Sequence, residues 1–64
     1  MVYDVSGRKL LIVEDDEKLK REMAAYFSRE NAVFTASDVE EAVDILSATG
    51  NFDAVILDLV LRHS

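Results

Sequence analysis

The sequence predicts an α/β domain in which three parallel β-strands alternate with two helices. Apolar runs of strand length occur at residues 10–13 and 52–61, and residues 32–36 are rich in strand-forming side chains. Unbroken apolar runs are typical of parallel strands that are covered on both faces. Between these segments, apolar residues recur at spacings of three and four, as they do in amphipathic helices. The 64 residues have room for one small domain.

The first strand is expected at residues 9–14, after a polar lead-in at residues 1–8 that is expected to fray. Asp16 is predicted to cap a helix over residues 17–30, because its carboxylate can accept from the free amides of the first turn. The apolar stripe of this helix is expected to face the core and consists of Leu19, Met23, Tyr26 and Phe27.

The second strand is predicted at residues 32–36, with Asn31 as a left-handed exit from the helix before it. A second helix is predicted over residues 38–48, and Gly50 is placed to end it. Capping-box spacing occurs twice at its start, in Ser37 with Glu40 and in Asp38 with Glu41, so its first residue stays open by one position. Its expected apolar stripe consists of Val39, Ala42, Val43 and Leu46.

The third strand is predicted at residues 53–59, with Asp53 capping or solvating its start and Asp58 inside it. Crossovers between parallel strands are right-handed, and a sheet covered on both faces needs its two helices on opposite sides. The spatial strand order is therefore predicted to be 2-1-3. In this order the carboxyl ends of the first and third strands are neighbours, and a crevice opens there. Glu14, Asp15 and Asp58 are all expected at that crevice.

Three carboxylates that converge on one site repel each other unless a proton or a cation intervenes. An all-oxygen ligand set without His or Cys favours a hard ion, and Mg²⁺ is the predicted cofactor. Asp58 is flanked by leucines in an apolar strand, which marks it as a candidate nucleophile toward phosphorus. Acids also follow strands because helices begin with them, and capping alone accounts for Asp16. His63, the only histidine, is expected to be a solvated loop residue.

The composition excludes several classes of protein. A net charge of −6, from 13 acidic and 7 basic residues, disfavours direct contact with nucleic acid. No apolar segment has the length of a membrane span and the start lacks a secretory signal, so a cytoplasmic location is expected. There is no cysteine, hence no disulfide or Cys-based zinc site, and oligomerisation is the remaining way to stabilise so small a core.

The segments "LLIVEDD", "ASDVEEA" and "FDAVILDLVL" together resemble the amino-terminal half of a response-regulator receiver domain of two-component signalling. The resemblance covers residues 9–62 and implies one half of a flavodoxin-like, doubly wound sheet. It implies that Glu14, Asp15, Asp58 and the backbone carbonyl of Val60 hold Mg²⁺. It further implies that Asp58 accepts a phosphoryl group from a histidine kinase. Such a domain is a signalling phosphoprotein and not an enzyme, apart from self-phosphorylation and autodephosphorylation.

The sequence also departs from the family. Receivers continue with two more strand-helix units, which supply a hydroxyl residue and a lysine, and Arg62 stands where the family usually has proline. Residues 9–64 are therefore interpreted as a truncated receiver whose third strand is an exposed edge. Two copies are expected to pair along that strand, or to exchange elements, as a homodimer. A non-catalytic half-domain whose property is self-association is the alternative function. A phosphate-ester hydrolase is disfavoured, because Val60 occupies the position where a second acid would be needed.

Overall fold

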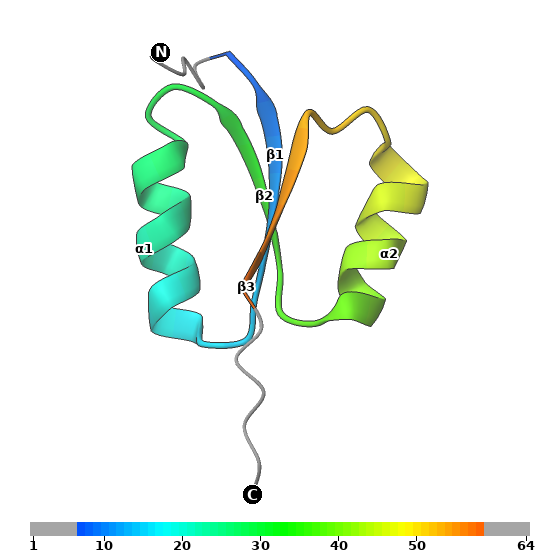
Figure 1. Ribbon diagram of the computed structural model, residues 1–64, viewed down its shortest axis with the longest axis horizontal. Coiled ribbons are helices and arrows are strands. Elements are labelled where there is room, and N and C mark those ends of the chain that lie inside the picture. The colour runs from blue at the N-terminus through cyan, green and yellow to red at the C-terminus, as the bar shows by residue number, and fades with distance from the viewer. Residues whose placement is uncertain (1–6, 59–64) are drawn as a thin grey trace, which may run out of the picture.

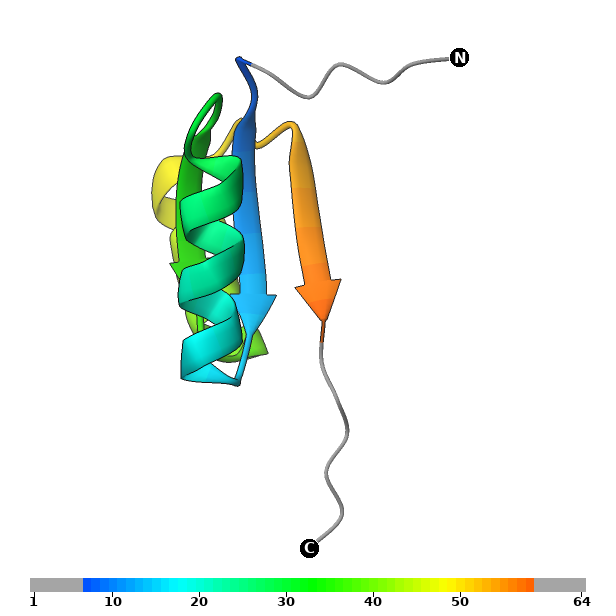
Figure 2. The same cartoon turned by 90° about the vertical axis from the view of Figure 1, so that its left-hand side faces the viewer.

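A computed structural model describes residues 7–58 of the chain, with the side chain of Asp58 excepted. The elements are β1 (Lys9–Glu14), α1 (Glu17–Phe27), β2 (Ala32–Ala36), α2 (Val39–Thr49) and β3 (Ala54–Asp58). The three strands form one parallel sheet in the order β2-β1-β3. The helices lie on opposite faces of this sheet (Figures 1 and 2). The prediction of an α/β domain with strand order 2-1-3 is confirmed.

β1 is the central strand, and its sequence is apolar because both of its faces are covered. Every residue from Leu10 to Glu14 is buried. Leu11 lies in register with Phe34 of β2 on one side and with Val55 of β3 on the other. The buried cluster between α2 and the sheet consists of Leu11, Val13, Ala36 and Ala42, with Ile45 and Phe52 packed against it. The core therefore lies over β1 and β2.

α1 begins where the predicted cap, Asp16, places its start, but it ends before the predicted residue. Asp16 Oδ1 accepts a hydrogen bond of 3.1 Å from the Leu19 amide. The helix ends at Phe27, earlier than expected, with Ser28 as its C-cap. The prediction of a left-handed Asn31 is wrong, because among the described non-glycine residues only Asn51 has a positive φ. Asn31 acts through its side chain, which donates to the Phe27 carbonyl (3.0 Å) and accepts from the Arg8 amide (2.9 Å).

The two ends of α2 are fixed by local hydrogen bonds. Asp38 is the N-cap and accepts from the Glu41 amide at 2.8 Å, while Glu41 Oε1 accepts from the Ser37 amide at 2.6 Å. The second of the two predicted capping arrangements is therefore the one that forms. Gly50 ends the helix with φ 65°, and its amide donates to the Leu46 carbonyl at 3.0 Å. This positive φ is readily adopted only by glycine.

The predicted apolar stripes of both helices need correction. Tyr26 is 66% exposed and lies outside the core, where its ring packs edge-on against Phe27 with centroids 5.1 Å apart. In α2 the residues that meet the core are Ala42 and Ile45. The other three members of the predicted stripe, Val39, Val43 and Leu46, stay exposed. The reason is the position of α2, which contacts β2 and β1 while leaving β3 uncovered.

The start of β3 is anchored to the start of β1. The Asp53 amide donates to the Lys9 carbonyl at 2.8 Å, and Asp53 Oδ2 accepts from the Lys9 amide at 2.8 Å. Lys9 Nζ donates to the Gly50 carbonyl at 2.8 Å and lies 4.7 Å from the centroid of the Phe52 ring. The carboxylate and the amide of Asp53 therefore both bond to the backbone of Lys9, whereas the sequence predicted only that Asp53 would cap or solvate the start of the strand.

None of the helices described is long and apolar enough to cross a membrane. The predictions for the lead-in at residues 1–6, for Val60 and for His63 lie outside the described residues.

Candidate functional site

The site forms where β1 and β3 end side by side. Glu14, the last residue of β1, is in parallel register with Asp58, the last residue of β3, and neighbouring strands of a sheet lie about 4.8 Å apart. β2 and β3 lie on opposite sides of β1, which is the arrangement at which open α/β sheets place ligands beyond the carboxyl ends of their strands. The backbones of two of the predicted site residues are thus adjacent.

Glu14 is an acid in the interior of the protein. Its side chain is 1% exposed, because it ends a strand that is covered on both faces. Oε1 accepts a hydrogen bond of 3.1 Å from the Asp16 amide. Within residues 7–58, Oε2 is buried without a hydrogen-bond partner. A buried oxygen without a partner is costly to the fold, and more so when it carries charge. This oxygen is suited to a proton or a cation as its partner.

Asp15 and Asp16 have different surroundings, although they follow Glu14 directly. Asp15 is exposed at the start of the loop, and Asp16 is engaged as the cap of α1. Among residues 7–58, no group of three or more acidic or imidazole side chains is placed to hold a metal ion. The carboxylate of Asp58 and the carbonyl of Val60 are outside the described atoms, so the predicted four-membered ligand set stays a prediction.

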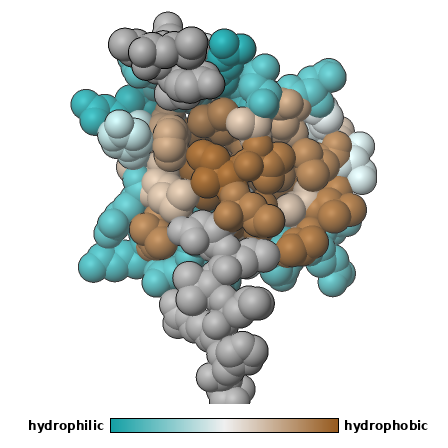
Figure 3. Space-filling model, in the orientation of Figure 1, coloured by the Kyte–Doolittle hydropathy of each residue, from teal (hydrophilic) through white to brown (hydrophobic). Residues whose placement is uncertain are grey.

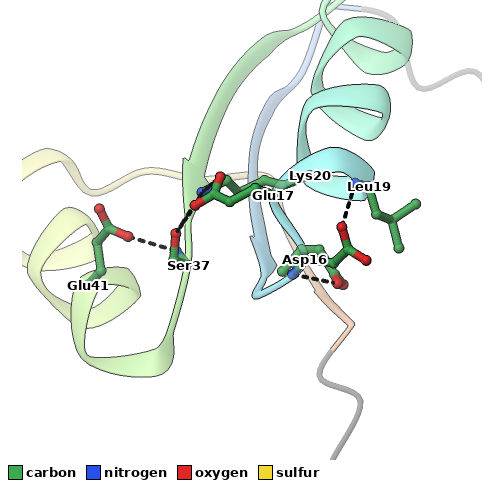
Figure 4. A network of polar contacts seen from close by, with 7 residues as sticks. Asp16, Glu17, Leu19, Lys20, Ser37 and Glu41 are labelled. Carbon is green, nitrogen blue, oxygen red and sulfur yellow. Dashed lines mark hydrogen bonds and ion pairs between the residues drawn. The ribbon is translucent and has the colours of Figure 1, made fainter.

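A polar network next to these acids connects α1 with the loop between β2 and α2 (Figure 4). Lys20 Nζ donates to Ser37 Oγ at 2.6 Å and forms an ion pair of 2.9 Å with Glu17 Oε2. Ser37 Oγ donates to Glu17 Oε1 at 3.3 Å. The network joins the start of one helix to the entry of the other, and so fixes two loops at the carboxyl end of the sheet.

The charge of Lys20 affects its acidic neighbour. The hydrogen bond from Lys20, together with the attraction of its ammonium group, lowers the pKa of Glu17 below its ordinary value. Sequence reasoning missed Lys20, although its spacing of three residues from Glu17 is typical of a helical ion pair. Its further contact with Ser37 depends on the tertiary structure, and no local pattern could have revealed it.

A hollow of about 410 Å³ lies at the other end of the sheet, where α1 leads into β2. Its lining consists of Tyr26, Phe27, Arg29, Glu30 and Asn31. Because β1 and β2 begin at this end, it is separated from Glu14 by the length of the strands and belongs to a different region of the molecule.

Comparison of the chain with protein-family models, with curated proteins and with solved structures yields no match. The likeness to receiver domains therefore depends on the motifs of the sequence. Two features of the structure can be compared with this likeness, namely the strand order and the register of Glu14 with Asp58.

Proposed function

We propose that this chain is the amino-terminal half of a receiver domain of flavodoxin-like fold, and that Asp58 is its phosphoacceptor. The observation that carries the proposal is the register of Asp58 with Glu14, a buried acid with one oxygen that has no partner within residues 7–58. In the intact protein the phosphodonor would be a histidine kinase in the cytoplasm. The donor class and the location derive from the resemblance of the motifs.

The residues fit a hard cation such as Mg²⁺. Glu14 offers a buried oxygen and Asp15 offers an exposed carboxylate at the adjacent position. By the resemblance to receivers, Asp58 and the carbonyl of Val60 would complete an all-oxygen set. Magnesium usually binds through one or two carboxylates, waters and a phosphate oxygen. When bound, it would offset the negative charge that an attacking carboxylate and a phosphoryl group bring together.

The proposed reaction is a phosphoryl transfer to a carboxylate. An oxygen of Asp58 attacks the phosphorus of a phosphohistidine, a new O–P bond forms and the N–P bond breaks. The nitrogen keeps the electron pair of the broken bond and takes up a proton. Glu14 and Asp15 would hold the charge-neutralising ion, and the contact of Lys20 with Ser37 fixes the start of α1 relative to the loop between β2 and α2.

The test uses the chain itself with Mg²⁺ and a small acyl phosphate as donor. The expected product is a single phosphoryl adduct, detected by mass spectrometry and mapped to Asp58. It should be absent without Mg²⁺ and absent in Asp58→Asn. Asp44→Asn is a matched control, because Asp44 is an exposed acid on α2, and it should be phosphorylated like the parent chain. A folded sample that forms no adduct, or forms it equally in Asp58→Asn, would contradict the proposal.

Self-association along β3 is the second candidate function. Within residues 7–58, β3 is an edge strand with no partner on its outer side, and Val55 and Leu57 are exposed on it. Unprotected edges of this kind pair readily with other strands. Sedimentation analysis should then show a dimer that persists in Asp58→Asn and dissociates in Val55→Asp. A folded monomer across the whole concentration range would rule this function out.

A further inference from the structure

The side chain of Glu14 is held at one of its two oxygens. Oε1 accepts a hydrogen bond of 3.1 Å from the Asp16 amide, while Oε2 is buried without a hydrogen-bond partner within residues 7–58. The residue is 1% exposed, so bulk water is not an alternative partner for either oxygen. The amide of Asp16 therefore fixes which oxygen of Glu14 is engaged and which is left for a ligand.

Asp16 can present this amide because it is the N-cap of α1. The first amides of a helix have no acceptor within the helix, and the amide of the N-cap residue is one of them. In a capping box, a Glu or Gln three residues further on accepts from it. α1 has Leu19 at that position, and the side chain of leucine offers no acceptor. The amide of Asp16 is thus left for Glu14, two residues before it.

Other groups of Asp16 tie this residue to the first turn of α1. Its Oδ1 accepts from the Leu19 amide at 3.1 Å (Figure 4), and its carbonyl accepts from the Lys20 amide at 2.8 Å. The side chain of Lys20 donates to Ser37 Oγ at 2.6 Å, which anchors this turn to the loop between β2 and α2. The direction of the Asp16 amide is consequently set by the position of α1.

The start of α2 is built differently and serves as a comparison. Its N-cap Asp38 accepts from the Glu41 amide at 2.8 Å, and Glu41 Oε1 accepts from the Ser37 amide at 2.6 Å. The side-chain acceptor for an amide at this end thus comes from α2 itself. At the start of α1 the acceptor comes from Glu14, the last residue of β1. Of these two helix starts, that of α1 is the one bonded to a residue of the candidate site.

We propose that Asp16 is a positioning residue for the divalent cation, because its cap aims the amide that holds Glu14 and leaves Oε2 for the ion. The inference rests on the proposed Mg²⁺ site and adds a residue outside the predicted ligand set. A glutamate side chain has several rotatable bonds, and fixing them before the ion arrives removes part of the entropic cost of binding. Hydrogen-bond partners of metal ligands typically contribute about 10–100-fold to metal affinity.

The test measures the dissociation constant of Mg²⁺ for the chain by NMR titration, followed at the amides of residues 14–16. Asp16→Asn and Asp16→Ser keep a capping oxygen without the charge, and should bind Mg²⁺ about tenfold more tightly than Asp16→Ala. Figure 3 shows hydrophilic surface around the start of α1, which suits these polar side chains. Asp38→Ala is the matched control, because it removes the same kind of cap and the same charge from α2. It should bind Mg²⁺ like the parent chain.

Leu19→Gln tests the same inference with the cap left in place. It introduces an oxygen that competes with Glu14 for the Asp16 amide, so Mg²⁺ should bind severalfold more weakly than in Leu19→Met, which lacks that oxygen. Equal affinities of these two variants would overturn the inference.

Two results with the cap variants would overturn the inference while leaving the proposed site in place. One is an equal affinity of Asp16→Ala and Asp16→Asn for Mg²⁺, and the other is a loss of affinity in Asp38→Ala as large as in Asp16→Ala. A parent chain that binds no Mg²⁺ would contradict the proposed function, and this inference with it.

Discussion

Replacing Glu14 by Gln tests whether this buried acid is there to hold a cation. The carboxylate is 1% exposed and its Oε2 has no partner within residues 7–58. Gln keeps the size of the side chain and an oxygen that can accept from the Asp16 amide, and it removes the charge. Leaving a buried polar group unsatisfied costs about 1–3 kcal/mol, and more for a charged group. In metal-free buffer we expect Glu14→Gln to raise the free energy of unfolding by part of this amount.

Added Mg²⁺ should reverse the order of the two proteins. A ligand at 100 times its dissociation constant stabilises the state that binds it by about 2.7 kcal/mol. The parent chain should gain this stability and Glu14→Gln should not. The assay is urea unfolding followed by circular dichroism at one fixed protein concentration, with and without Mg²⁺. Glu22→Gln, at an exposed position of α1, is the matched control and should follow the parent chain.

A Glu14→Gln variant that is less stable than the parent chain in the absence of metal would contradict this prediction, because the charge would then be supported by groups within the fold. Equal stabilisation of the parent chain and of Glu14→Gln by Mg²⁺ would contradict it as well.

Three further predictions concern the helices and the network beside the site. Asp16→Ala removes the hydrogen bond to the Leu19 amide and should lower the free energy of unfolding by about 1 kcal/mol. Urea unfolding measures this loss, and an unchanged midpoint would contradict the cap. Gly50→Ala places a Cβ at φ 65° in ordinary contact, 4.0 Å from the Leu46 carbonyl oxygen, so backbone strain without a clash should cost about 1–2 kcal/mol. A stability equal to that of the parent chain would contradict this expectation. Lys20→Gln removes the ammonium that lowers the pKa of Glu17, so NMR titration should show this pKa moving up toward its ordinary value. Because the pKa of Glu17 is depressed in the folded state, the stability that this pair contributes is present at neutral pH and is lost as pH falls through the folded-state pKa. A pKa of Glu17 that stays unchanged in Lys20→Gln would show that the ion pair does not form in solution.

Local physical chemistry made much of the fold readable from the sequence. The extent of β1 follows from its unbroken apolar run, the start of α1 from Asp16, and the end of α2 from Gly50. Each of these depends on residues that are close together in the chain. The strand order also follows, since right-handed crossovers with helices on opposite faces leave one simple arrangement. The adjacency of Glu14 and Asp58 was predictable for the same reason, because both residues end neighbouring parallel strands.

The partners of the site residues were not predictable in this way. A glutamate at the end of a strand can be solvated or buried, and only the packing around β1 leaves Oε2 of Glu14 without a partner in residues 7–58. The contact between Lys20 and Ser37 joins α1 to the loop between β2 and α2, and these residues are far apart in the sequence. Asn31 was expected to act through its backbone and acts through its side chain, because the start of β1 passes close to the end of α1.

The sequence by itself determined where β1, α1 and β2 begin, how the strands are ordered and that Glu14 and Asp58 lie at the carboxyl end of the sheet. It also predicted an apolar stripe of Val39, Ala42, Val43 and Leu46 on α2, but it could not show which of these residues the sheet would bury. The tertiary structure decided this point, since α2 lies over β1 and β2. Ala42 is therefore buried, while Val43 is left exposed. A periodic pattern fixes the direction in which a helix is apolar, whereas burial depends on where the sheet lies beneath it.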